Sequence, residues 1–270
     1  MTTQASHTML QWLADSNAAQ RVMLKFRLPQ LANLLFGLVP VYEQLKRTGI
    51  RYRIRKAESV IVANEIFNDK VYRNSVSSTV ISIMDIGCNV GFFPLFCAET
   101  LGRKNLEGIA IDANSAMVDE TRWHLRKNGL SKIEAIHGLA GAPQDQQEGT
   151  FYLSPINIAS SVRATPNPNL PAKGELKAIQ VRTVNLAAEW KKRFGPKRIH
   201  LLKIDVEGYE KELIENSREL LALADVIAMD IHKWAVSPEE IKSLLEQNNF
   251  EQYAVAGESM HCVVGFFRRK

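Results

Sequence analysis

The sequence predicts an α/β fold of the Rossmann-like type, with a mostly parallel sheet and a helical extension on its N-terminal side. Three observations support this prediction. From about residue 78 onward, short apolar runs alternate with segments of helical periodicity, a glycine-containing turn follows the first run, and acidic residues end several runs. Strands that alternate with helices form a largely parallel sheet with both faces covered. The length of 270 residues suits one such domain with an extension, or two small domains.

The composition is that of a globular protein with a sizeable core, since 46% of the residues are hydrophobic and 23% are charged. The net charge of +5 is below what a dedicated nucleic-acid-binding domain tends to carry. The three cysteines, Cys88, Cys97 and Cys262, are too few and too scattered for a disulfide framework or a zinc cluster, which favours a cytoplasmic location. The N-terminus lacks the layout of a secretory signal.

Residues 1–56 are predicted to form a helical extension that acts as a lid. Apolar residues within 1–50 recur at a spacing of three to four, which is typical of helices. The most apolar run, residues 31–42, is shorter than the roughly 20 residues that span a bilayer. A core-packed helix is expected there, with a surface helix that touches a membrane or an apolar substrate as the alternative. Residues 51–56 alternate basic and apolar side chains, as in an edge strand whose charged face is solvated.

The Rossmann-like domain is predicted to comprise residues 57–270. Its first five strands are expected, from buried-type apolar runs, at residues 80–85, 106–112, 133–136, 200–205 and 226–231. Its helices are expected at residues 92–101, 116–128 and 209–221, and from residue 237 onward.

The alternation pauses between residues 142 and 185, where an insertion is predicted. Its strands, near 150–153 and 179–184, would form a hairpin around a loop rich in proline and asparagine. Near the C-terminus, two further strands around residues 253–255 and 262–267 are predicted to pair in antiparallel fashion.

Open parallel sheets bind ligands at the carboxyl ends of their strands. The first strand is followed by DIGCNVG, residues 85–91, in which glycines allow a tight turn and a close approach to a ligand. Dinucleotide dehydrogenases carry G-x-G-x-x-G at this place. The acidic Asp85 and the missing third glycine favour a ligand with a sulfonium and an amino group over a pyrophosphate. Further polar residues at predicted strand ends are Asp112, His137, Asp205 and Asp230.

Asp112 ends the second strand, roughly 20 residues past the glycine turn, where a carboxylate can accept both ribose hydroxyls of a nucleoside. The alternative is that Asp112 or Asn114 only caps the following helix. His137-Gly138-Leu139-Ala140, at the end of the third strand, is expected from its position to line the adenine.

The fourth strand leads into KIDVEGYE, residues 203–210. This segment resembles the KIDVEGxE motif of FkbM-type methyltransferases, and DIGCNVG resembles their DxGxNxG nucleoside loop. Glu65-Ile66-Phe67 with Tyr72 resembles the EIF…Y element ahead of their first core strand, and Ala159-Ser160-Ser161 resembles their small-residue segment. The resemblance covers roughly residues 58 to 267. The chain departs from the family pattern at Asp112, where a glutamate followed by proline is commoner.

The resemblance implies a Rossmann-like class I methyltransferase sheet of seven strands. It also implies methyl transfer from S-adenosylmethionine, with S-adenosylhomocysteine as the product, to a hydroxyl of a small molecule such as a sugar or secondary metabolite. The expected partner is therefore a small hydroxylated acceptor rather than nucleic acid. The predicted cofactor-binding residues are Glu65, Tyr72, Asp85, Gly87, Asn89, Gly91, Asp112, Ala113, Gly138, Ser161 and Asp205.

Methyl transfer to a hydroxyl requires alignment of donor and acceptor, and often removal of a proton. Asp205 and Glu207, and likewise Asp230 and His232, have an i, i+2 relation at the ends of adjacent predicted strands. The favoured interpretation makes His232 or Glu207 the general base, with Asp205 holding cofactor or acceptor. In a second interpretation, Asp205, Asp230 and His232 hold a divalent cation. In a structural one, Lys203 pairs with a carboxylate and Glu207 caps the next helix.

Three other functions compete with the leading hypothesis. The basic charge and the run at residues 51–56 leave open a methyltransferase that acts on RNA or protein. A nicotinamide-dependent oxidoreductase is disfavoured by Asp85 and the missing glycine. A non-catalytic nucleoside-binding subunit would carry the same motifs.

Overall fold

The computed structural model describes residues 38–102, 105–143, 145–154, 159–164, 175–259 and 261–270. The chain divides into two compact units, Met1–Lys70 and Val71–Lys270. The boundary predicted from the sequence, after residue 56, falls inside the first unit. In the described part of the chain, no helix is long and apolar enough to cross a membrane.

The first unit contains a β-hairpin where a helix was expected. Strands β1 (Val41–Gln44) and β2 (Arg51–Ile54) pair in antiparallel register. The edge strand predicted at residues 51–56 is thus confirmed, but the helix predicted through residue 50 is wrong for the described residues from Val41 onward. Pro40 disfavours a helix that continues through this position. Gly49, with a φ of 72°, completes the turn between the two strands.

The expected core-packed helix at residues 31–42 is also not supported by its described part. Leu38 and Val39 are 71% and 74% exposed, and Tyr42 lies on the exposed side of β1. The helices predicted further toward the N-terminus lie outside the described residues. After the hairpin come helix α4 (Glu58–Ala63) and the π-helical turn η1 (Asn64–Asn68).

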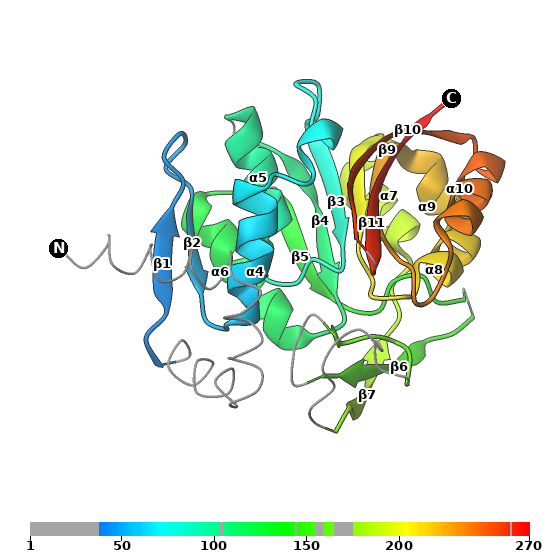
Figure 1. Ribbon diagram of the computed structural model, residues 1–270, viewed down its shortest axis with the longest axis horizontal. Helices are drawn as coiled ribbons and strands as arrows, with labels where there is room; N and C mark the ends of the chain where they lie inside the picture. Colours follow the sequence, from blue (N-terminus) through cyan, green and yellow to red (C-terminus); the bar gives the residue numbers. More distant parts are fainter. Residues whose placement is uncertain (1–37, 103–104, 144, 155–158, 165–174, 260) are drawn as a thin grey trace. The chain divides into compact units, whose positions relative to one another are not determined.

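The second unit is built on a central sheet with the order β10-β11-β9-β8-β3-β4-β5 (Figure 1). Five strands run parallel, while β11 is antiparallel to β9 and β10 is antiparallel to β11. This confirms the predicted mostly parallel sheet of seven strands in the described part of the chain. The strands are β3 (Ser82–Ile86), β4 (Glu107–Asp112), β5 (Ile133–His137), β8 (Ile199–Ile204), β9 (Ala224–His232), β10 (Phe250–Glu258) and β11 (Cys262–Arg269).

Helices connect these strands, and most of them lie where the sequence predicted. They are α5 (Phe92–Leu101), α6 (Ser115–Asn128), α7 (Leu186–Phe194), α8 (Glu210–Asn216), α9 (Arg218–Leu223) and α10 (Pro238–Gln247), with the short 3-10 turn η2 (Arg73–Ser75) ahead of β3. Two differences stand out. Helix α7 was not predicted, and the helix expected at residues 209–221 is interrupted at Ser217 into α8 and α9.

The insertion forms the predicted hairpin. Strands β6 (Glu148–Leu153) and β7 (Lys177–Arg182) pair in antiparallel register as a separate two-stranded sheet. A bridge between Leu139 and Thr183 joins the base of this hairpin to the segment after β5. Most of the predicted proline-rich loop lies outside the described residues.

The central strands of the sheet are deeply buried in the hydrophobic core. All five residues of β3 are buried, and Trp190 of α7 is fully buried within the main hydrophobic cluster around β8 and β9. Strands that are apolar on both faces can only lie in the middle of a covered sheet. Because β3, β4, β8 and β9 run parallel, their carboxyl ends lie at the same edge of the sheet.

Candidate functional site

The glycine turn after β3 crosses directly in front of the end of β8. A side-chain Cβ on Gly87 would lie 1.7 Å from the carbonyl oxygen of Asp205, and the φ of Gly87 is 73°. Only glycine fits here, because any other residue would need both that space and a left-handed backbone. The amide of Gly87 donates to Ile111 O at 3.0 Å, so the turn is also fixed to β4.

Asp112, at the end of β4, holds this turn through its carboxylate. Its Oδ2 accepts a hydrogen bond from the amide of Asn89 at 2.9 Å, and its Oδ1 accepts one from the amide of Asn114 at 2.8 Å. Burial raises the pKa of Asp112 to about 6, although both backbone hydrogen bonds act to lower it. A carboxylate offers about four lone-pair sites, so Asp112 retains acceptor capacity for a ligand.

A cleft opens in front of these strand ends. Seven of the predicted catalytic and cofactor-binding residues line it: Gly87, Asn89, Asp112, Ala113, Gly138, Asp205 and Glu207. The remaining wall is mostly apolar and includes Met117, Leu139, Ala140, Phe151, Val162 and Tyr209. Leu139 and Ala140 belong to the segment expected beside the adenine. The other four side chains were missed, since an apolar residue that lines a cleft looks in the sequence like any core residue.

Four other predicted cofactor residues lie behind this wall. Asp85 is fully buried beneath the turn, and Gly91 packs against Thr121. The hydroxyl of Tyr72 donates to Asp230 Oδ1 at 2.9 Å, and the hydroxyl of Ser161 donates to the carbonyl of Glu207 at 2.7 Å. These residues support the site rather than face the cleft. A fifth, Glu65, belongs to the first unit and lies in η1 with an exposed side chain.

Lys203 of β8 connects the glycine turn to the cleft. Its Nζ lies 3.3 Å from Asp85 Oδ1 and 3.3 Å from Asp205 Oδ2, and it donates to the carbonyl of Gly87. The approach to Asp85 is an ion pair rather than a well-directed hydrogen bond, because neither Asp85 oxygen has a hydrogen-bonding partner in the described structure. Burial acts to lower the pKa of Lys203, but the two carboxylates reverse that effect and raise it. Lys203 was predicted to pair with a carboxylate, and it pairs with two, those of Asp85 and Asp205.

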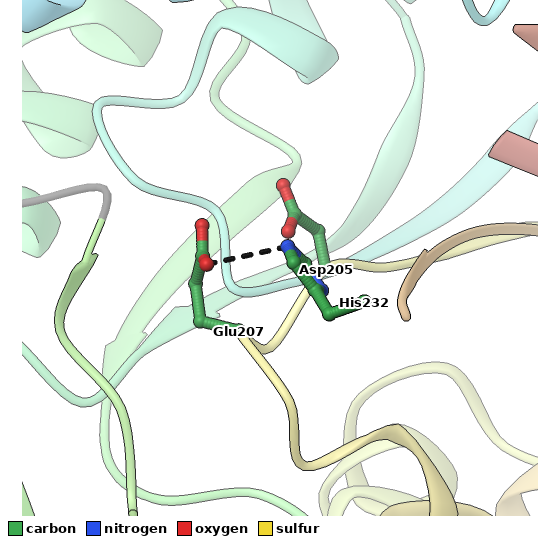
Figure 2. Close-up of side chains that lie close together, drawn as sticks. All are labelled: Asp205, Glu207 and His232. Atoms are coloured by element: carbon green, nitrogen blue, oxygen red, sulfur yellow. Dashed lines mark ion pairs between the residues drawn. The ribbon is translucent and has the colours of Figure 1, made fainter. Parts of the chain in front are cut away.

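Asp205, Glu207 and His232 form a cluster beside the cleft, with one ligand atom from each within 4.8 Å of the others. Figure 2 shows the three side chains directed toward one another. Glu207 Oε2 lies 3.2 Å from His232 Nε2. Such oxygen and nitrogen donors could hold a divalent cation. The alternative predicted metal set differs from this cluster, because Asp230 contacts Tyr72 instead.

The backbone brings this cluster together in an unexpected way. Strand β8 ends at Ile204, so Asp205 and Glu207 do not continue the strand as predicted. Instead the chain turns through Glu207 and Gly208, which have φ values of 48° and 92°. This turn, rather than strand alternation, directs Glu207 toward His232 at the end of β9.

The methyltransferase FkbM domain family matches residues 85–251, more than half of the chain. The chain belongs to this family. The family predicted from the sequence is therefore confirmed, and the chain carries a methyltransferase domain of that family. No curated protein sequence matches it.

Solved structures similar to the FkbM chain include several methyltransferases. TrmK of M. capricolum, in complex with S-adenosylhomocysteine, is 12% identical, with 76% of this chain and 68% of that chain covered and a TM-score of 0.47. TYW2 of M. jannaschii, in complex with AdoMet, is 13% identical, with 86% and 87% covered and a TM-score of 0.46. A SAM-dependent methyltransferase of Aquifex aeolicus is 13% identical, with 76% and 91% covered and a TM-score of 0.43. At TM-scores below 0.5, these similarities do not bear on the substrate or the site.

Glu210 is a further residue of the site whose role the sequence did not reveal. It is fully buried, its Oε1 lies 2.7 Å from His232 Nδ1, and the same oxygen accepts the amide of Gly208 at 3.0 Å. Its place in KIDVEGYE was visible, but its role depends on burial against β9. The predicted helix-capping role of Glu207 is not observed, because its carboxylate contacts His232 and α8 begins only at Glu210.

The electrostatics of the cluster follow from this enclosure. Burial acts to lower the pKa of His232, but the carboxylates of Glu207 and Glu210 raise it well above its ordinary value. Burial also raises the pKa of Glu207. Desolvation and the nearby charge of Asp205 raise the pKa of the half-buried Asp230 to about 8. At neutral pH, His232 and Asp230 are thus expected to retain their protons.

Proposed function

We propose that this FkbM methyltransferase transfers the methyl group of S-adenosylmethionine to a hydroxyl oxygen of a small molecule. The observation that carries the proposal is the contact between Glu207 and His232 at the edge of the cleft. An alcohol oxygen attacks a methyl carbon more readily when its proton is removed in the same step. A carboxylate–imidazole pair beside the cleft supplies the group that receives this proton.

The residues of the cleft fit the cofactor. Asp112 retains acceptor sites that suit two ribose hydroxyls, and the apolar wall around Leu139 and Phe151 suits a purine ring. The carboxylates of Asp205 and Glu207 line the cleft, and their negative charges suit an amino group and a sulfonium. The same charges oppose a pyrophosphate, which supports a methyl donor over a nicotinamide dinucleotide.

Each member of the cluster has a distinct part in the proposed reaction. S-adenosylmethionine supplies an electrophilic methyl carbon. The acceptor oxygen forms a bond to that carbon while the carbon–sulfur bond breaks, and the hydroxyl proton passes to the Glu207–His232 pair. Glu210 holds Nδ1 of His232, which fixes the orientation of the ring. Asp205, held by Lys203, positions cofactor or acceptor.

The acceptor side of the cleft is proposed to be shaped by the insertion at residues 142–185. Within it, Val162 contributes apolar surface and Ser160 polar surface to the cleft wall. A hydrophobic wall with a few polar groups is typical of a pocket for a small organic molecule.

The test is a transfer assay with radiolabelled S-adenosylmethionine. The purified chain is incubated with hydroxylated small molecules, including sugars and polyketide alcohols, and in parallel with total RNA and with protein extract. The proposal predicts label in a small-molecule ether that resists mild alkali, with much less product from Glu207→Gln. Label in RNA or protein at a higher rate would overturn the small-molecule assignment.

A further inference from the structure

The backbone at Glu207 adopts a conformation that it would not hold by itself. Its φ of 48° is left-handed, and the next residue, Gly208, also has a positive φ of 92°. A residue with a Cβ pays for this geometry through a clash with its own carbonyl group, so such conformations persist only where neighbouring groups fix them. The groups that fix this turn therefore decide where the Glu207 carboxylate lies.

Two side chains of one segment bind the carbonyl groups of this turn. The hydroxyl of Ser161 donates to Glu207 O at 2.7 Å, and Nε of Arg163 donates to Gly208 O at 2.5 Å. Arg163 also pairs with Glu212 of α8, at 2.8 Å between Nη2 and Oε1. Ser161 is 5% exposed, so water cannot replace its contact readily.

The segment that carries these side chains is itself anchored. Ser161 and Tyr152 of β6 exchange two backbone hydrogen bonds, of 2.8 and 3.1 Å. The alternate residues of this segment, Ser160 and Val162, instead line the cleft. Side chains thus alternate along residues 160–163, two toward the cleft and two toward the Glu207 turn, as expected for an extended segment.

We propose that Ser161 and Arg163 are positioning residues that hold the Glu207–Gly208 turn and thereby set the contact between Glu207 and His232. Their importance for methyl transfer rests on the proposed function. Their effect on the contact itself does not, so it can be measured without cofactor or acceptor. Because the same segment lines the cleft, it also links the cleft wall to the position of the proton acceptor.

The experiment follows the His232 ring by NMR as the pH is varied, with its signals identified by their absence in His232→Gln. The groups that face this ring are Glu207, Glu210, Asp230, Asp205 and Cys262. In Arg163→Ala, the midpoint of the His232 titration is expected to fall by about one pH unit, because a carboxylate near a histidine raises its pKa by about that much or more. Removal of the Arg163 charge alone would raise the midpoint, so a fall reports on geometry.

Three further variants make the result decisive. Ser161→Ala removes a single hydroxyl and is expected to lower the midpoint in the same direction, even if Arg163→Ala does not fold. Arg163→Lys, which keeps a cation and a donor, is expected to stay closer to the native midpoint. The matched control is Arg198→Ala, because Arg198 also binds a carboxylate and backbone carbonyls, of Asp225, Ala222 and Ala224.

The outcomes separate the inference from the proposed function. An unchanged midpoint in folded Ser161→Ala and Arg163→Ala would overturn the inference, and so would an equal fall in Arg198→Ala. If S-adenosylhomocysteine fails to bind the native chain while the midpoints move as expected, the positioning role stands and the proposed methyl transfer fails.

Discussion

His232 Nε2 lies 3.2 Å from a carboxylate oxygen of Glu207, while the other ring nitrogen lies 2.7 Å from Glu210. The imidazole is therefore held between two carboxylates at the end of β9. A ring in this position does not titrate as an isolated histidine, and a proton that enters belongs to the Glu207–His232 pair. The pair, rather than either residue alone, is the proton acceptor in the proposed reaction.

Replacement of Glu207 by glutamine tests this role with little change in shape. The variant keeps the size of the side chain but removes its charge, so the rate of methyl transfer is expected to fall by about 10²–10⁴-fold, the usual effect of losing a general base. Affinity for S-adenosylhomocysteine, measured by calorimetry, is expected to change little. Glu240→Gln, at an exposed ion pair with Lys211, is the control. Equal rates in the two variants would rule out the proton-accepting role.

The pH dependence of the reaction follows from the raised pKa of His232. The native pair holds a proton at neutral pH, which must leave before the pair can accept one from the acceptor. The rate is therefore expected to rise as the pH increases toward the raised pKa of His232, which lies above the ordinary histidine value of about 6.5, and to level off beyond it. A pH–rate profile at saturating cofactor checks this, and a rate that falls over the same range would contradict it.

The same shift predicts how folding stability changes with pH. A histidine whose pKa is raised in the folded state contributes stability that is fully present below its unfolded pKa. This contribution is lost as the pH rises through the raised pKa of His232. Urea denaturation across that range is expected to show the loss in the native chain and a smaller one in His232→Gln. A loss of equal size in both would assign it to another group.

Removal of metal ions is expected to leave methyl transfer unchanged. Asp205, Glu207 and His232 lie close enough to hold a divalent cation. Both carboxylates of this cluster, however, already contact a cationic group, because Asp205 pairs with Lys203 and Glu207 pairs with the His232 ring. Dialysis against EDTA followed by the transfer assay tests this prediction. Loss of activity that Mg²⁺ or Mn²⁺ restores would instead favour a metal-assisted reaction.

Gly87 is expected to be the least replaceable glycine of the site. In Gly87→Ala the new methyl group would meet the Asp205 carbonyl at 1.7 Å, and the backbone would remain left-handed. Overpacking and the left-handed backbone together predict a loss of about 2–4 kcal/mol in the free energy of unfolding. Gly129→Ala shares the positive φ but has nothing within 4 Å, so it should cost only about 1 kcal/mol. Similar losses in urea denaturation would contradict this assignment.

The central strands could be predicted from the sequence because each is a continuous apolar run, and the glycine turn and Asp112 follow from the rule that ligands bind at strand ends. Strand β1 could not be predicted in this way, since it depends on pairing with Arg51–Ile54 across a turn. Helix α7 was hidden because its short amphipathic segment follows directly on a strand-like stretch. Periodicity describes local preference, and these elements are decided by partners elsewhere in the chain.

The sequence predicted most of the residues of the candidate site but few of the contacts between them. Asp205, Glu207 and His232 were all expected at one edge, but the left-handed turn that joins them was not. The hydrogen bond between Tyr72 and Asp230 links residues 158 positions apart. Likewise, the role of Glu210 requires knowledge of what buries it. Such contacts arise from packing between distant segments, which sequence spacing does not describe.

Cofactor binding at Asp112 is tested most directly by a calorimetric titration with S-adenosylhomocysteine of the native chain and of two variants, Asp112→Asn and Asp119→Asn. We predict micromolar binding by the native chain that weakens as the pH falls below about 6, where Asp112 takes up a proton. In Asp112→Asn the affinity should drop about tenfold or more, as expected for the loss of a charged hydrogen-bond acceptor, and lose this pH dependence. Asp119→Asn, at an exposed position on α6, should bind like the native chain. No binding by the native chain, or equal binding by all three, would contradict the assignment of this cleft to S-adenosylmethionine.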